Sequence, residues 1–138
     1  MLKVYNTLSR KKEVFKSIKP KEVKMYVCGP TVNGVPHLGH ARVQVVFDVL
    51  RKYLTYSGYN VKFVSNITDI EDKIITKAKE LGISIEELSE KNLKEHLEDY
   101  KELGAKKPDL QPKATEYVKE MVDLVKKLEK KGYTYSIE

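Results

Sequence analysis

Two histidines are the side chains in this sequence best placed to do chemistry. His37 and His40 stand three residues apart, so on a helix they lie on one face. An imidazole can donate a hydrogen bond to an anion or exchange a proton near neutral pH. Gly39, between them, would let a flat or bulky ligand approach the backbone. The pair is therefore a candidate site for an anionic ligand.

The segment around the histidines indicates how they are held. Residues 25–42 read MYVCGPTVNGVPHLGHAR: an apolar run typical of a strand, a loop rich in glycine and proline, and the start of a helix. We expect Pro36 at the first helical position, where proline is favoured. The free N–H groups and dipole of a helix N-terminus attract phosphate. Together these features predict a phosphate-handling site, although a surface histidine beside a capping histidine would give the same short motif.

The residues after the histidines predict an α/β fold. Apolar residues between 38 and 54 have helical spacing, and Ser57-Gly58 would end that helix. Residues 24–28 and 60–64 are predicted strands, so the unit is strand, helix, strand. This implies a right-handed parallel crossover, half of a Rossmann-like sheet. Ligands of such sheets bind at the carboxyl ends of the strands, where Cys28 and residues 65–68 would lie.

The other elements follow from turns, capping boxes and glycines. Residues 2–7 and 13–17 predict an N-terminal hairpin. Capping boxes beginning at Thr68 and Ser84 predict helices that end near Gly82 and Gly104. Residues 106–112 are expected to form a loop, 114–129 an amphipathic helix and 133–137 the start of a strand. The acidic run 69–72 is interpreted as first-turn residues that complement the helix dipole, and His96 as a solvated surface residue.

Composition sets broad limits on the class of protein. The chain has 138 residues, 41% of them hydrophobic, enough for one modest domain with a core. The net charge of +6 weakly favours anionic partners. A single cysteine allows no internal disulfide, and no apolar run of about 18 residues could span a membrane. We expect a cytoplasmic protein.

The motifs resemble those of a known enzyme family. PHLGH is similar to the HIGH signature of class I aminoacyl-tRNA synthetases. The longer series MYVCGPTV, HLGHAR, FDVLRKYL and NITDIEDKI resembles the N-terminal part of cysteinyl-tRNA synthetases. The similarity runs from LKVYNTLSRKKEVF at the start to KPDLQPKATEYV and KKGYTYS near the end. It implies ATP-dependent activation of L-cysteine and its transfer to tRNA(Cys).

The resemblance also implies roles in ATP binding. His37 and His40 would be catalytic residues that stabilise charge on the α-phosphate while the cysteine carboxylate attacks it. Gly29 and Gly39 would let ATP, with Mg²⁺, approach closely.

Substrate and metal roles are implied in the same way. Thr31 and Thr68 would contact the substrate, although Thr68 also suits a helix N-cap. Cys28 from composition alone would be an inert buried residue. The resemblance makes it instead one ligand of a Zn²⁺ that takes the substrate thiolate, the other ligands lying outside this chain. Asn66 and Asp69 are plausible pocket residues without an assigned role.

The sequence departs from the family in what it lacks. A KMSKS-like loop and an anticodon-binding region are absent. We expect residues 1–82 to form the first half of a catalytic domain and residues 83–138 the helical start of an insertion. The chain would need a separate C-terminal half, and alone would be inactive or very weak. Two alternatives remain: a paralogue that joins cysteine to an amino sugar, as in mycothiol synthesis, and a non-catalytic module that binds nucleotide or tRNA.

Overall fold

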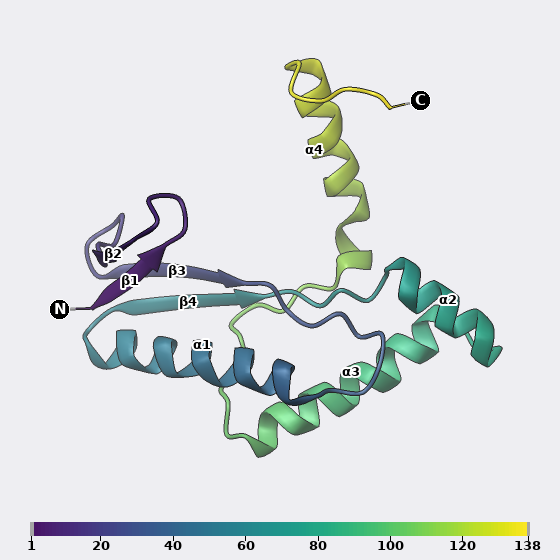
Figure 1. The fold of residues 1–138 in the computed structure, drawn as a ribbon, viewed down its shortest axis with the longest axis horizontal. Coiled ribbons are helices and arrows are strands. Elements are labelled where there is room, and N and C mark those ends of the chain that lie inside the picture. Colours follow the sequence, from purple (N-terminus) through teal and green to yellow (C-terminus); the bar gives the residue numbers. More distant parts are fainter. Residues whose placement is uncertain (1, 138) are drawn as a thin grey trace.

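The computed structural model describes residues 2–137. Figure 1 shows two parallel strands, with a hairpin where they begin and helices beyond their carboxyl ends and alongside them. The elements are β1 (Lys3–Asn6), β2 (Lys11–Val14), β3 (Glu22–Val27), α1 (Leu38–Tyr56), β4 (Asn60–Ser65), α2 (Asp72–Leu81), α3 (Ile85–Glu102), the 3₁₀ helix η1 (Ala114–Tyr117) and α4 (Val118–Lys130).

The central unit is β3–α1–β4. The two strands pair in parallel, from Glu22 opposite Asn60 to Val27 opposite Ser65, and α1 packs against β4. The helix ends at Ser57, and Gly58 follows with a φ of +85°, which glycine adopts at little cost. This confirms the predicted α/β class and Rossmann-like parallel half-domain, followed by helices.

Residues 109–113 extend the sheet, where the sequence predicted only a loop. Leu110 forms a parallel bridge with Val64, and Lys113 forms one with Ile67. The N–H of Ile67 donates to the carbonyl of Pro112 at 2.8 Å. Prolines lack an N–H and are tolerated where only their carbonyl is needed, as at a sheet edge. The segment therefore covers the free side of β4 despite its prolines.

An ion pair fixes this segment to α1. Arg51, buried on α1, donates to Asp109 at 2.6 Å and to the carbonyl of Lys107 at 2.7 Å. The second carboxylate oxygen of Asp109 accepts the N–H of Phe63 at 2.7 Å. The Phe63 N–H is the largest cause that lowers the pKa of Asp109, and the charge of Arg51 acts in the same direction. One carboxylate thus joins α1, β4 and the edge segment.

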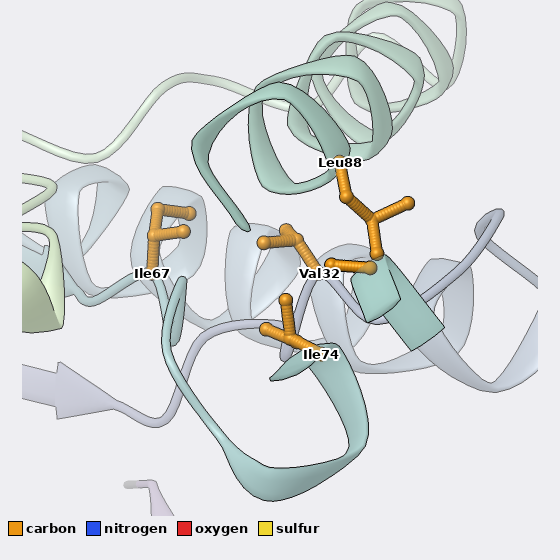
Figure 2. Packing of buried hydrophobic residues seen from close by; sticks show 5 residues of the cluster. Val32, Ile67, Ile74 and Leu88 are labelled. Atoms are coloured by element: carbon orange, nitrogen blue, oxygen red, sulfur yellow. The ribbon is translucent and has the colours of Figure 1, made fainter. Parts of the chain in front are cut away.

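The main apolar cluster lies beyond the carboxyl ends of the strands. It comprises Val32, Ile67, Ile74, Ala78 and Leu88, all nearly inaccessible to solvent. Figure 2 shows Val32 and Ile67, from the segments after β3 and β4, facing Ile74 of α2 and Leu88 of α3. Burying such side chains contributes about 1.5–3 kcal/mol each. The cluster contains residues from both sides of position 82, where the sequence predicted a division into two regions. That division stays a prediction.

Two predicted helix starts and one predicted strand are wrong, and the second hairpin strand begins at Lys11 instead of residue 13. Helix α1 begins at Leu38 with His37 as its N-cap, so Pro36 precedes the helix. Helix α2 begins at Asp72, because Thr68 remains extended in a bridge to Thr31. Within the described residues, 133–137 form no strand. The Ser84 cap is confirmed, since its hydroxyl accepts the Glu87 N–H at 3.0 Å.

Acidic residues 69–72 also differ from their prediction. Only Asp72 lies in the first turn of α2. Asp69 is buried and accepts hydrogen bonds from the N–H and hydroxyl of Thr115, at 3.0 and 2.6 Å. It therefore fixes the start of η1 to the segment after β4 instead of complementing a helix dipole.

The amphipathic helix predicted at 114–129 is present as η1 and α4, but its apolar face is exposed. Figure 1 shows α4 projecting away from the other elements, and none of its residues is buried. Its exposed apolar residues are Val118, Met121, Val122, Leu124, Val125 and Leu128. Of the helices that the structure describes, none combines the length and apolarity of a membrane span.

We expect Asp109→Asn to destabilise the chain by about 1–2 kcal/mol. The change removes a charged acceptor and leaves Arg51 buried without its ion-pair partner; partial exposure of the carboxylate limits the loss. The lowered pKa favours the folded state above the unfolded-state pKa of about 3.9, and this contribution is lost as pH falls through the folded-state pKa. Urea melts at pH 7 and pH 3.5 should show the Asn variant losing less stability on acidification. Asp123→Asn on exposed α4 is the matched control, and an equal effect there would contradict the assignment.

Candidate functional site

The site begins where the segments after β3 and β4 meet. The side-chain oxygen of Asn66 accepts the N–H of Gly29 and the hydroxyl of Tyr26, both at 2.9 Å. Its amide group donates to the Thr68 hydroxyl at 3.2 Å. A Cβ on Gly29 would stand only 1.5 Å from the carbonyl oxygen of Asn66. Gly29 is therefore required by contact within the chain, independently of its proposed contact with ATP.

The two threonines predicted to contact substrate are brought together. Thr31 and Thr68 form a parallel bridge, and the N–H of Val32 donates to the carbonyl of Thr68 at 3.1 Å. The N–H of Thr68 donates to the carbonyl of Pro30 at 3.0 Å. Neither threonine is buried, and the two lie side by side where the segments after β3 and β4 meet. Their role as substrate contacts stays a prediction.

His37 and His40 form a reciprocal cap at the start of α1. Nδ1 of His37 accepts the Gly39 N–H at 3.1 Å, and Nδ1 of His40 accepts the His37 N–H at 3.2 Å. The rings stack with centroids 4.0 Å apart. Because both Nδ1 atoms are acceptors, each neutral ring carries its proton on Nε2. The pair therefore offers two adjacent Nε2–H donors.

This geometry corrects the expected source of anion binding. The N–H groups of Gly39, His40 and Ala41 all have acceptors within the cap, at 3.1, 2.8 and 3.3 Å. They are not the free backbone donors that the sequence suggested. Gly39 also has a second purpose, since a Cβ there would stand 2.8 Å from Cε1 of His37. An anion would therefore be bound by the imidazole groups and attracted by the helix dipole, because those N–H groups already have acceptors.

His96 joins this pair, contrary to its interpretation as a surface residue. Its ring is fully buried and meets the His40 ring edge-on, with centroids 4.8 Å apart. The Tyr100 ring also meets the His96 ring edge-on, with centroids 6.0 Å apart. Neither nitrogen of His96 has a hydrogen-bond partner among the described residues. A buried polar group left unpaired requires an explanation, and a site that handles protons or anions is one.

One face of α3 packs against the loop after β3 and against His40. Asn92, His96 and Tyr100 recur every four residues, continuing the buried face that begins with Leu88. Asn92 donates to the carbonyl of Val32 at 2.8 Å and so fixes the loop after β3. The spacing was visible in the sequence, but its polar residue types suggested a solvated face.

Burial lowers the pKa of both inner histidines. For His40, burial is the larger cause and the nearby His37 adds to it. For His96, burial again acts most strongly and His40 adds to it. The Gly34 backbone and Asp99 oppose this shift in the pKa of His96, although the Gly34 backbone does not reach hydrogen-bond geometry. Both rings are therefore mainly neutral at pH 7, which keeps Nδ1 of His40 an acceptor in the cap and leaves its proton on Nε2.

Cys28 directly follows β3, and its thiol is exposed, not buried as composition alone suggested. With His40 and Tyr100 it lines a cavity of about 80 Å³. A thiolate is a suitable soft ligand for zinc, but a structural site needs four ligands. No cluster of three or more His, Cys, Asp or Glu able to hold a metal occurs within residues 2–137. Cys28 therefore fits one position of a zinc site and the described residues do not complete it.

We expect His96→Leu to keep or increase the stability of the chain at pH 7.5, by up to about 1 kcal/mol. The change replaces unpaired buried nitrogens with an apolar side chain of similar size. Since the folded-state pKa of His96 lies below the unfolded value of about 6.5, its neutral form adds stability above pH 6.5 that is lost as pH falls through the folded-state pKa. The variant should therefore lose less stability than the parent between pH 7.5 and 5.5 in urea melts. A loss above about 2 kcal/mol at pH 7.5 would mean that the ring has a polar partner.

The sequence pattern described as the class I (C) tRNA synthetase catalytic domain matches residues 14–138. A cysteine–tRNA ligase of Thermococcus kodakarensis is 52% identical over 97% of this chain and 28% of its own length. One of Finegoldia magna is 54% identical over 99% of this chain and 30% of its own length. One of Geobacillus thermodenitrificans is 45% identical over 99% of this chain and 29% of its own length.

The chain thus spans less than a third of the length of these curated relatives. The match covers the strand–helix–strand unit, both histidines and the segments that Asn66 joins. The chain therefore belongs to the family of class I tRNA synthetase catalytic domains that is found in cysteine–tRNA ligases.

Proposed function

We propose that this chain provides the amino-terminal part of a cysteine–tRNA ligase active site. The reaction would be ATP-dependent activation of L-cysteine, followed by transfer to tRNA(Cys), and residues beyond this chain would complete the site. The observation that carries the proposal is the pair of Nε2–H donors at the start of α1, together with the cavity that His40 and Cys28 both line.

The histidines suit the charge that develops during activation. The cysteine carboxylate would attack the α-phosphorus of ATP, and the bond to the pyrophosphate oxygen would break. Charge builds on the equatorial phosphate oxygens, and donors already fixed in place stabilise it without reorganisation. The reciprocal cap fixes both rings before substrate binds. His37 and His40 would therefore act on the transition state more than on ground-state binding.

His96 and Tyr100 would position His40. The edge-on contact at 4.8 Å limits rotation of the His40 ring, and the buried surroundings keep it neutral. Water is excluded from the inner face of the cluster because His96 is fully buried. A less solvated site strengthens the donated hydrogen bonds.

Cys28 would contribute to recognition of the substrate side chain. If three ligands from outside this chain joined it, the bound zinc would favour a thiolate over the hydroxyl of serine. The thiol lies in the same cavity wall as His40, so side-chain recognition and phosphate contact would be adjacent. Thr31 and Thr68, held together by backbone hydrogen bonds, would border the amino acid.

We expect His37→Asn and His40→Asn each to lower cysteine-dependent ATP–pyrophosphate exchange by about 10²–10³-fold. The assay uses a chimera in which this chain replaces the matched segment of the Finegoldia magna relative. Asparagine keeps an oxygen near the position of Nδ1, so the cap persists, but it lacks the Nε2 donor. The alanine variants should lose the same activity and, in addition, about 1 kcal/mol of stability.

Exchange within tenfold of the parent chimera, with the fold retained, would contradict the donor assignment. This chain alone should show little or no exchange. If even the parent chimera showed none while still binding ATP, the chain would be a non-catalytic nucleotide-binding module.

We expect Cys28→Ser in the same chimera to weaken both zinc retention and cysteine affinity. A hydroxyl is a poorer ligand for zinc than a thiolate, and loss of one ligand opens the metal site. Zinc content by atomic absorption and cysteine affinity by equilibrium dialysis are the measurements. Thr7→Ser in the N-terminal turn controls for general effects of substitution. Unchanged zinc content and unchanged affinity in Cys28→Ser would show that Cys28 is not a ligand.

A further inference from the structure

The net charge of the chain is confined to its first 24 residues. Residues 1–24 contain eight Lys or Arg and two Glu, a net charge of +6, whereas residues 25–138 contain eighteen of each sign. All eight of these cations are exposed. The net positive charge of the whole chain is therefore concentrated on the β1–β2 hairpin and the connector to β3.

Few of these cations are neutralised by nearby carboxylates. Within residues 2–137 the only ion pair in this region is Lys19 with Glu22, at 4.0 Å. Glu13 instead accepts a hydrogen bond from Asn6 at 3.2 Å. Unpaired surface cations attract polyanions, because neutralising phosphates releases counterions.

The hairpin has one inner and one outer face. Phe15 packs edge-on against Tyr59, just before β4, with centroids 5.9 Å apart, and Val4 is half-buried. Side chains alternate between the faces of a strand, so Lys3 and Tyr5 share the opposite, outer face. Lys12 lies directly opposite Tyr5 in the antiparallel register and shares that face too. Tyr5 is 60% exposed, although a tyrosine of a small domain usually buries most of its ring.

The turn holds this face in place. The Asn6 side chain accepts the N–H of Leu8 at 3.0 Å, a local bond typical of tight turns. Arg10 closes the turn with a φ of +55°. The N–H of Phe15 donates to the carbonyl of Leu2 at 2.9 Å and fixes the open end. The outer face therefore presents an aromatic ring between cations on a defined two-stranded platform.

We propose that this outer face, Lys3, Tyr5 and Lys12 with the neighbouring cations, binds single-stranded nucleic acid. The cations would contact phosphates and one base would stack on the Tyr5 ring, the combination that sequence-tolerant single-strand binders use. Figure 1 shows the hairpin where β3 and β4 begin, at the opposite end of the sheet from the start of α1, the element end that carries the two histidines. The surface is thus separate from the proposed reaction site and does not depend on cysteine activation.

Fluorescence anisotropy with labelled 12-nucleotide single-stranded RNA and DNA tests this proposal on the chain itself. Removing two phosphate contacts with Lys3→Gln/Lys12→Gln should reduce the slope of log affinity against log salt by about 1.4. Tyr5→Ser should weaken binding about tenfold with the slope unchanged, and Tyr5→Phe should restore it. Lys126→Gln/Lys127→Gln on exposed α4 makes the same charge change elsewhere and should leave binding unchanged.

Heparin, a polyanion without bases, separates stacking from charge. Tyr5→Ser should bind heparin like the parent, whereas Lys3→Gln/Lys12→Gln should bind it more weakly. The proposal is overturned if the α4 double variant loses as much affinity as the hairpin double variant. It is also overturned if Tyr5→Ser binds the oligonucleotides as the parent does, or if the chain prefers phosphatidylserine vesicles to both oligonucleotides.

Discussion

The contact between the two segments that follow the parallel strands is the constraint on which the site depends. Asn66 accepts the N–H of Gly29, and the main chains there approach too closely for any side chain at residue 29. This contact sets the position of Thr31 beside Thr68 and brings Val32 and Ile67 into the main apolar cluster. The hydrogen bonds orient the segments, and the buried apolar side chains supply most of the free energy that keeps them together.

Helix α3 converts this scaffold into a chemical site. Its Asn92 holds the loop that leads to the histidines, and its His96 contacts the inner edge of His40. The cluster keeps an unsatisfied buried imidazole, which costs stability and is the kind of local conflict expected at functional sites. The reciprocal cap has a different effect, because it satisfies helix N–H groups while it fixes the tautomer of both rings.

The polar supports and the apolar surfaces of the chain are distributed unevenly. Arg51 and Asp109 join α1, β4 and the edge segment through bonds of 2.6–2.7 Å, so the sheet has three parallel segments although only two are regular strands. In contrast, the apolar face of α4 and much of α1 are exposed, including Val46, Val49 and Tyr53. Charge is uneven too, since the net positive charge lies in residues 1–24, the hairpin with the connector to β3, and the rest of the chain is balanced.

The sequence by itself determined the elements whose signals are local. The Ser84 cap, the glycines at 58, 82 and 104, and the apolar spacing of α1 encode backbone preferences within a few residues, so the parallel half-unit could be predicted. The motif around His37 and His40 indicated the family, and the family pattern matches residues 14–138. Only the tertiary structure decided what depends on contacts between distant residues. Thr68 could not cap α2 because its main chain pairs with residues 30–32, and His96 is buried because α3 lies against the start of α1. Helical spacing places a residue on a face, but which face is buried depends on the segments packed against it.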